Sequence, residues 1–175
     1  MNALAAIDEL CGELIFLRNL AKQGGNSSVP RAALAPYLLV QRARFLRFDR
    51  EWKRQHGPHA EYGTSVYADV ARRLSDASDI LRATPEGRRG NPPAHCWRDA
   101  TDEIRDALRH ALECSAVASA HMRGHRMPSF YRVGGLEVFD SACLDCGRGV
   151  RVDLSPAPNS AELTGEALAL GCIDK

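Results

Sequence analysis

The stretch Cys143-Leu-Asp-Cys-Gly147 decides how the last third of this 175-residue chain folds. A C-x₂-C pair followed by a small residue lets one tight turn present two thiolates to the same metal ion. Cys172 follows the pair, and His125 precedes it just after the expected end of a helix. Because Zn²⁺ prefers four tetrahedral thiolate or imidazole ligands, Cys143, Cys146, Cys172 and His125 predict a Cys₃His zinc site.

The fourth ligand of this predicted site has competitors. His121 lies one helical turn before His125 and is the alternative imidazole. We favour His125 because Gly124 can end the helix and let the following backbone turn towards the metal. A water molecule in the fourth position would instead make the zinc catalytic. No H-E-x-x-H pattern occurs in the chain and no H-x-E pattern adjoins the cysteine pair, so we expect a structural zinc.

Two other chemistries use a C-x-x-C pair. A redox motif belongs at the start of a helix in a βαβ unit, and no such pattern surrounds Cys143. A disulfide framework needs an oxidising compartment and usually a Cys-dense secreted chain. Neither context fits this sequence as well as a metal site does.

Residues 121–173 resemble a zinc ribbon, in which short strands carry the metal turns. Residues 139–147 are expected to enter the first turn as a strand, residues 149–154 to return, and residues 162–172 to bring the third sulfur as a last strand. The resemblance implies that the three cysteines are ligands and that His125 is the fourth. The lone Cys172 departs from the ribbon pattern, which has a second cysteine pair.

The residues before this segment predict a mainly α protein with an antiparallel four-helix bundle and a small C-terminal β zinc ribbon. Apolar residues recur every three or four positions, separated by Gly- and Pro-rich punctuation. The expected helices are 2–22, about 30–56, 62–83 and 94–123. We therefore expect two domains, a bundle over 1–123 and a ribbon module over 124–175 packed on the bundle end.

Composition narrows the class of protein. The chain is 45% hydrophobic and 26% charged, with a net charge of +1. No apolar run approaches the roughly 18 residues that cross a bilayer. The first ten residues carry acids where a signal peptide needs basic residues. These features predict a cytoplasmic protein without a membrane partner.

Charge is distributed unevenly. Between residues 31 and 59, seven Arg and Lys residues accompany two acidic ones, whereas from residue 133 seven acidic residues accompany three basic ones. An Arg-rich helix and a loop with two arginines can follow a phosphate backbone without reading base sequence. The residues expected to contact nucleic acid are Arg42, Arg47, Arg50, Lys53, Arg54, Arg88, Arg89 and Arg126. Taken alone, the helical stripe is more simply a solvated face.

The predicted function is that of a small, non-enzymatic, nucleic-acid-associated protein with structural Zn²⁺. Zinc ribbons recur in nucleoprotein machines, and the resemblance adds to the argument from the arginines. The alternative is a protein–protein adaptor or assembly subunit of a larger complex, which would use exposed aromatic side chains. A hydrolase or deaminase is less favoured because nucleophile, P-loop and zinc–glutamate motifs are missing from the sequence.

Overall fold

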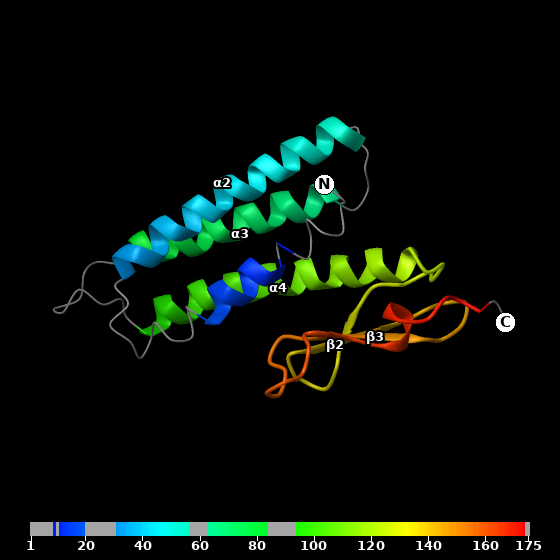
Figure 1. The fold of residues 1–175 in the computed structure, drawn as a ribbon. Coiled ribbons are helices and arrows are strands. Elements are labelled where there is room, and N and C mark those ends of the chain that lie inside the picture. Colours follow the sequence, from blue (N-terminus) through cyan, green and yellow to red (C-terminus); the bar gives the residue numbers. More distant parts are fainter. Residues whose placement is uncertain (1–8, 10, 20–30, 57–62, 84–93, 174–175) are drawn as a thin grey trace. The chain divides into compact units, whose positions relative to one another are not determined.

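The computed structural model describes residues 9, 11–19, 31–56, 63–83 and 94–173 (Figure 1). Residues 11–19 are helical, and the long helices are α2 (Arg31–His56), α3 (Gly63–Ala83) and α4 (Ala94–His121). A small antiparallel sheet follows, so the protein is mainly α with a short β segment near its C-terminus. Two compact units can be distinguished, Met1–His110 and Ala111–Lys175, and α4 contributes to both. The predicted boundary at residue 123 and the packing of the ribbon on the bundle stay predictions.

Helices α2 and α3 lie side by side and run antiparallel (Figure 1). Spacings of three and four residues place the apolar side chains of each helix on one face. Leu38 and Phe45 of α2 and Leu74 of α3 are almost fully buried, and each such side chain stabilises the fold by about 1.5–3 kcal/mol. The hydroxyl of Ser78 donates a hydrogen bond of 3.2 Å to the Ala35 carbonyl, which satisfies a buried polar group in this contact.

Ion pairs join other neighbouring helical segments of the first unit. Arg44 of α2 pairs with Glu13 at 2.9 Å. Arg73 of α3 pairs with Glu103 of α4 at 3.1 Å and with Asp106 at 3.3 Å. Partly exposed pairs of this kind contribute about 0–1 kcal/mol each, so they orient the helices more than they stabilise them.

The sheet has the strand order β1-β2-β3-β4 with antiparallel neighbours throughout. Its strands are β1 (Tyr131–Arg132), β2 (Val138–Ala142), β3 (Gly149–Asp153) and β4 (Leu163–Thr164). Buried and exposed side chains alternate in the central hairpin, where Phe139 and Ser141 of β2 face Val152 and Val150 of β3 on the buried side. The turn between β2 and β3 carries the C-x₂-C pair.

The core of the second unit is small. Ala116 and Ala120, from the last turns of α4, pack with Val150 and Ala167. The partly buried apolar side chains around this cluster are Met127, Phe130, Leu163 and Leu168. Since two alanines form the helical side of the core, the sheet gains little apolar burial from them.

The expectation of one continuous strand over 162–172 is wrong. Strand β4 ends at Thr164, and the 3₁₀ helix η1 (Glu166–Leu168) follows Gly165. Gly165 has φ 136°, and a Cβ atom there would lie 2.3 Å from the Gly149 carbonyl oxygen. The chain bends at this glycine and buries Ala167 instead of extending the sheet. Strand β1 was not expected, and α4 ends two residues before its predicted end.

Within the described parts of the chain, no helix combines the length and the apolar character that crossing a bilayer requires.

Candidate metal centre

His125 is positioned by the end of α4. Gly124 has φ +80°, and its N–H donates to the His121 carbonyl at 2.9 Å. The N–H of His125 donates to the Ala120 carbonyl at 3.1 Å. This pair of bonds around a left-handed glycine is a Schellman motif, which ends the helix and turns the backbone. The role that the sequence predicted for Gly124 is therefore confirmed, and His125 is 1% exposed just beyond it.

The C-x₂-C pair lies on the tight turn after β2. The N–H of Gly147 donates to the Cys143 carbonyl at 3.0 Å, and the N–H of Cys143 donates to the Arg148 carbonyl at 2.9 Å. Gly147 has φ +75°, a conformation that residues with a Cβ rarely adopt. These bonds hold Cys143 and Cys146 on one side of the turn, as the small residue at 147 predicted.

Cys172 lies in the irregular segment that follows η1. Its N–H donates to the Arg123 carbonyl at 2.8 Å, which joins this segment to the residues that follow α4. The Arg148 guanidinium donates to the Gly171 carbonyl and joins the same segment to the metal turn. One backbone bond and one bond from a side chain thus hold this segment near the other two sulfurs, although no strand carries Cys172.

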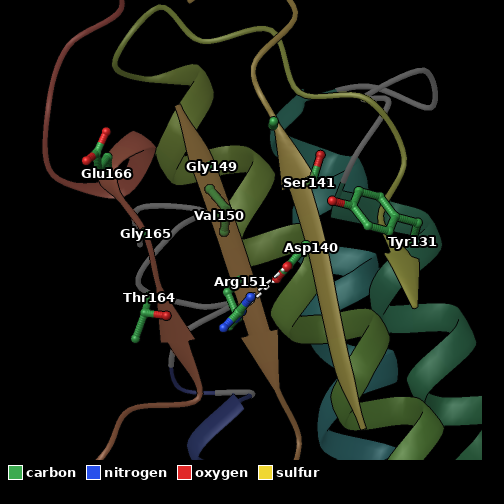
Figure 2. A pocket seen from close by; sticks show the side chains of 10 residues that line it. Tyr131, Asp140, Ser141, Gly149, Val150, Arg151, Thr164, Gly165 and Glu166 are labelled. Atoms are coloured by element: carbon green, nitrogen blue, oxygen red, sulfur yellow. Dashed lines mark hydrogen bonds and ion pairs between the residues drawn. The ribbon is translucent and has the colours of Figure 1, made fainter. Parts of the chain in front are cut away.

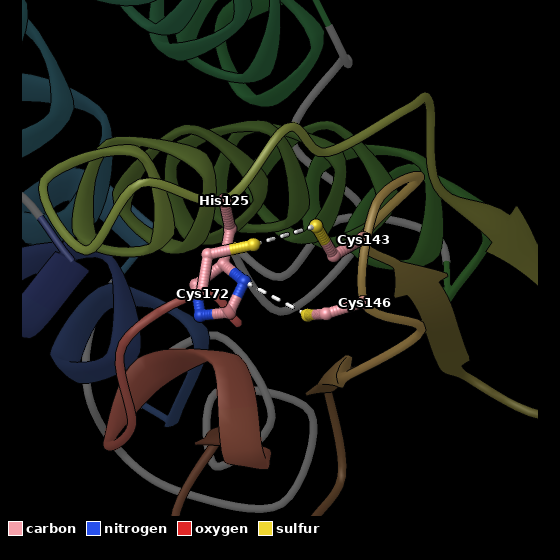
Figure 3. Close-up of side chains that lie close together, drawn as sticks. All are labelled: His125, Cys143, Cys146 and Cys172. Atoms are coloured by element: carbon pink, nitrogen blue, oxygen red, sulfur yellow. Dashed lines mark hydrogen bonds between the residues drawn. The ribbon is translucent and has the colours of Figure 1, made fainter. Parts of the chain in front are cut away.

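The four predicted ligands lie together, as Figure 3 shows. Their ligand atoms are all within 4.8 Å of one another. The Cys143 and Cys172 sulfurs are 3.9 Å apart, and the Cys146 sulfur is 3.4 Å from Nδ1 of His125. A tetrahedral ion with bonds of about 2.3 Å to sulfur and 2.0 Å to nitrogen separates its ligands by roughly 3.5–3.8 Å. The geometry therefore suits a metal ion.

The orientation of the His125 ring is fixed by a second hydrogen bond. Its Nε2 lies 2.8 Å from the Leu170 carbonyl and donates to it. Nδ1 is consequently the nitrogen that faces the Cys146 sulfur. Metal-binding histidines typically use one nitrogen for the ion and donate from the other. The bond to Leu170 also raises the pKa of His125, against the opposing effect of burial.

The thiols of Cys143 and Cys172 have very different proton affinities. Burial raises the pKa of Cys143, but backbone N–H groups of Cys146, Asp145 and Arg126 outweigh it and lower this pKa to about 6. Burial and the two neighbouring thiols raise the pKa of Cys172 to about 12. Negative charges this close disfavour one another, so the full set of thiolates requires a cation between them.

His121, the alternative imidazole ligand, lies outside the group of four side chains. It is exposed at the last residue of α4. In the residues that the structure describes, no other group of three or more His, Cys, Asp or Glu side chains is arranged to hold a metal.

The residues predicted to contact nucleic acid are distributed over both units. On α2, Arg47, Arg50, Lys53 and Arg54 are exposed and Arg42 is half-buried. Lys53 pairs with Asp49 at 2.7 Å. Arg126 belongs to the second unit and pairs with Asp145 at 2.6 Å, beside the metal turn. Arg88 and Arg89 lie outside the described residues.

Sequence reasoning missed the groups that support the ligands. The carbonyls of Leu170, Arg123 and Gly171 orient His125 and the Cys172 segment. Backbone carbonyls carry no side-chain signal, so no residue pattern could have marked them.

Comparison with protein-family models, curated proteins and solved structures finds no match. The fold and the site define a class by themselves: a mainly helical protein whose C-terminal unit has a Cys₃His group able to hold a metal ion.

Proposed function

We propose that this is a non-enzymatic zinc protein in which Zn²⁺ closes a zinc-ribbon-like C-terminal unit. The observation that carries the proposal is the grouping of His125, Cys143, Cys146 and Cys172 within 4.8 Å. Three soft thiolates and one imidazole in tetrahedral arrangement select zinc over magnesium, calcium or manganese. A reducing compartment such as the cytoplasm would keep the thiols available as ligands.

Four protein ligands support a structural role for this zinc. A catalytic zinc keeps one position open for water or substrate, whereas a tetrahedral ion here would have all four filled. The nearby carboxylate of Asp145 is paired with Arg126. In a unit with so few large buried side chains, the free energy of metal binding would serve as free energy of folding.

The zinc proposal is tested with the full chain and a matched cysteine control. Cys146→Ser should lose the one equivalent of zinc that the native chain binds, because a serine hydroxyl is a poor replacement for a thiolate. Cys114→Ser removes a thiol from α4, outside the group, and should keep the metal. Zinc content is measured by elemental analysis after gel filtration, and full retention by Cys146→Ser would sink the ligand assignment.

We further propose that α2 contacts the phosphate backbone of a nucleic acid without reading its sequence. Support comes from the exposed positions of Arg47, Arg50 and Arg54 along one helix. Arg42, Lys53 and, from other segments, Arg88, Arg89 and Arg126 complete the proposed set. Each neutralised phosphate should add about −0.9 to the slope of log affinity against log salt on duplex DNA.

The nucleic-acid proposal predicts a loss of binding on charge reversal. Replacing Arg47, Arg50 and Arg54 together by Glu should abolish binding of a duplex DNA or RNA probe while circular dichroism keeps its helical signal. The control reverses three exposed arginines outside α2 and away from the Cys₃His group, Arg82, Arg98 and Arg132. Unchanged affinity in the α2 variant would remove this helix from the proposal.

An adaptor or assembly subunit is the second candidate, and exposed apolar side chains of the C-terminal unit favour it. Leu144, Ile173 and Met122 are each more than 60% exposed, and a partner protein that covered them would remove this apolar surface from water. A stoichiometric protein complex that survives nuclease treatment and high salt would support this function over the first.

The helical part is proposed to close into one antiparallel four-helix bundle. Burial raises the pKa of Tyr67 on α3 to about 12, with contributions from Cys11 and Glu9, so the 11–19 segment approaches α3. The same segment pairs with α2 through Arg44, and α3 pairs with α4 through Arg73. These contacts are those of helices around a common core.

A further inference from the structure

One row of side chains crosses the outer face of the sheet. The strand register aligns Tyr131 of β1 with Asp140 of β2, Asp140 with Arg151 of β3, and Arg151 with Thr164 of β4. Residues in register on adjacent strands point to the same face. This face is opposite to the one that carries Phe139, Val150 and Val152 into the core.

Beside this row the outer face is hollow. Ala142 pairs with Gly149, and these two small residues leave space where other pairs would place side chains. The result is an open groove of about 380 Å³, within the usual range of ligand sites. Figure 2 shows Tyr131 and Glu166 on opposite sides of the groove.

The groove has a net negative lining. Arg151 donates two hydrogen bonds of 2.8 Å to the two carboxylate oxygens of Asp140, so these charges neutralise each other. The same bonds hold the pKa of Asp140 below its ordinary value and keep the pair ionised. Glu166 is exposed, and no ion pair to another described residue compensates its charge. One negative charge is thus left for a ligand.

We propose that this groove binds the cationic side chain of an arginine from an extended segment of a partner protein. Glu166 would pair with the guanidinium, and the ring of Tyr131, which is 61% exposed, would stack against its plane. The Thr164 hydroxyl offers a hydrogen-bond acceptor on the side of the groove where Glu166 lies. Phosphates of a nucleic acid fit this lining poorly because the uncompensated charge of Glu166 repels them.

This site goes beyond the proposed zinc function and does not depend on nucleic-acid binding by α2. It requires only a folded C-terminal unit, which zinc content and dispersed amide signals report separately. Failure of the groove proposal would therefore leave the zinc proposal standing.

The first test compares two capped pentapeptides on the zinc-loaded full chain, Gly-Ser-Arg-Ser-Gly and the same peptide with citrulline in place of arginine. Citrulline keeps the size and planarity of arginine but has no charge. The arginine peptide should shift the amide NMR signals of Tyr131, Thr164 and Gly165 in a saturable way, and the citrulline peptide should not. Equal shifts with both peptides would overturn the proposal.

The second test uses variants of the groove. Glu166→Gln and Tyr131→Leu should each weaken binding of the arginine peptide about two- to five-fold, as expected for an exposed ion pair or a surface cation–π contact. Asp79→Asn, an exposed position on α3, removes one negative charge elsewhere and should have no effect. Native affinity in Glu166→Gln would contradict the proposal. So would an oligothymidylate that shifts the same signals when the arginine peptide does not.

Discussion

The two units of this protein are stabilised by different means. Helices α2 and α3 of the first unit bury large side chains such as Leu38, Phe45 and Leu74 along a continuous seam. The second unit has a core built around Ala116, Ala120, Val150 and Ala167, and it also contains the Cys₃His group. A seam distributes its stabilising free energy over many contacts, whereas a metal site concentrates it in a few bonds. Removing the metal should therefore unfold the second unit as a whole, whereas removing one contact of the seam should only lower the stability of the first unit.

Metal removal should produce the largest difference between the units. Structural zinc sites supply about 10–16 kcal/mol of binding free energy in small zinc-finger peptides, so chelation should unfold the sheet. Residues of α2 and α3 should stay protected in hydrogen exchange while β2 and β3 lose protection. Equal loss of protection in both units would show that they fold as one cooperative system, and restored protection on adding Zn²⁺ is the control.

Truncating a buried side chain between α2 and α3 should affect the first unit and leave the second unit unchanged. Leu74→Ala should lower the free energy of unfolding of the helical unit by about 2–5 kcal/mol, because it leaves a cavity between α2 and α3. Zinc stoichiometry should be unchanged. Denaturant unfolding measured by circular dichroism checks the first effect and elemental analysis the second. The exposed Val40→Ala is the matched control and should change stability little.

The bend after β4 gives a smaller and more local effect. Gly165→Ala places a Cβ against the Gly149 carbonyl oxygen and forces a φ that alanine rarely adopts. Backbone strain of this kind costs about 1–3 kcal/mol, so the zinc affinity of the second unit should fall. Gly171→Ala is the control, since a Cβ there meets no atom within 4 Å. Equal zinc affinity in the two variants, from competition with a chelating dye, would contradict the role of the bend.

The smallest expected effect is at the end of α4. Gly124→Ala should destabilise the second unit by about 1 kcal/mol, because alanine is strained at φ +80° even though the space is ordinary. The Cβ would make only a 3.6 Å contact with Cys172. The variant should keep its zinc and lose a few-fold in affinity, whereas complete loss of the metal would mean that the cap does more than shape the turn.

The residues of the Cys₃His group were predictable because their signals are local. Cys143 and Cys146 need only a tight turn, and Gly147 supplies its left-handed residue. Gly124 indicates a helix end, which favours His125 over His121. The strands on either side of this turn were expected for the same reason, and β2 and β3 form there.

The features that sequence reasoning missed all involve contacts between distant segments. The bend at Gly165 depends on the Gly149 carbonyl, and the path to Cys172 depends on the carbonyls of Arg123 and Leu170. The groove exists because Ala142 and Gly149 meet across β2 and β3. None of these residues has a pattern that identifies its partner.

Residue order alone thus specified where the long helices and the two central strands form and which side chains are suited to a metal, since those properties depend on residues close by in the sequence. It did not specify how the third sulfur reaches the other ligands, which nitrogen of His125 faces them, or what lies on the outer face of the sheet. Those properties depend on backbone groups and small side chains brought together by packing, and only the folded chain determines which of them meet.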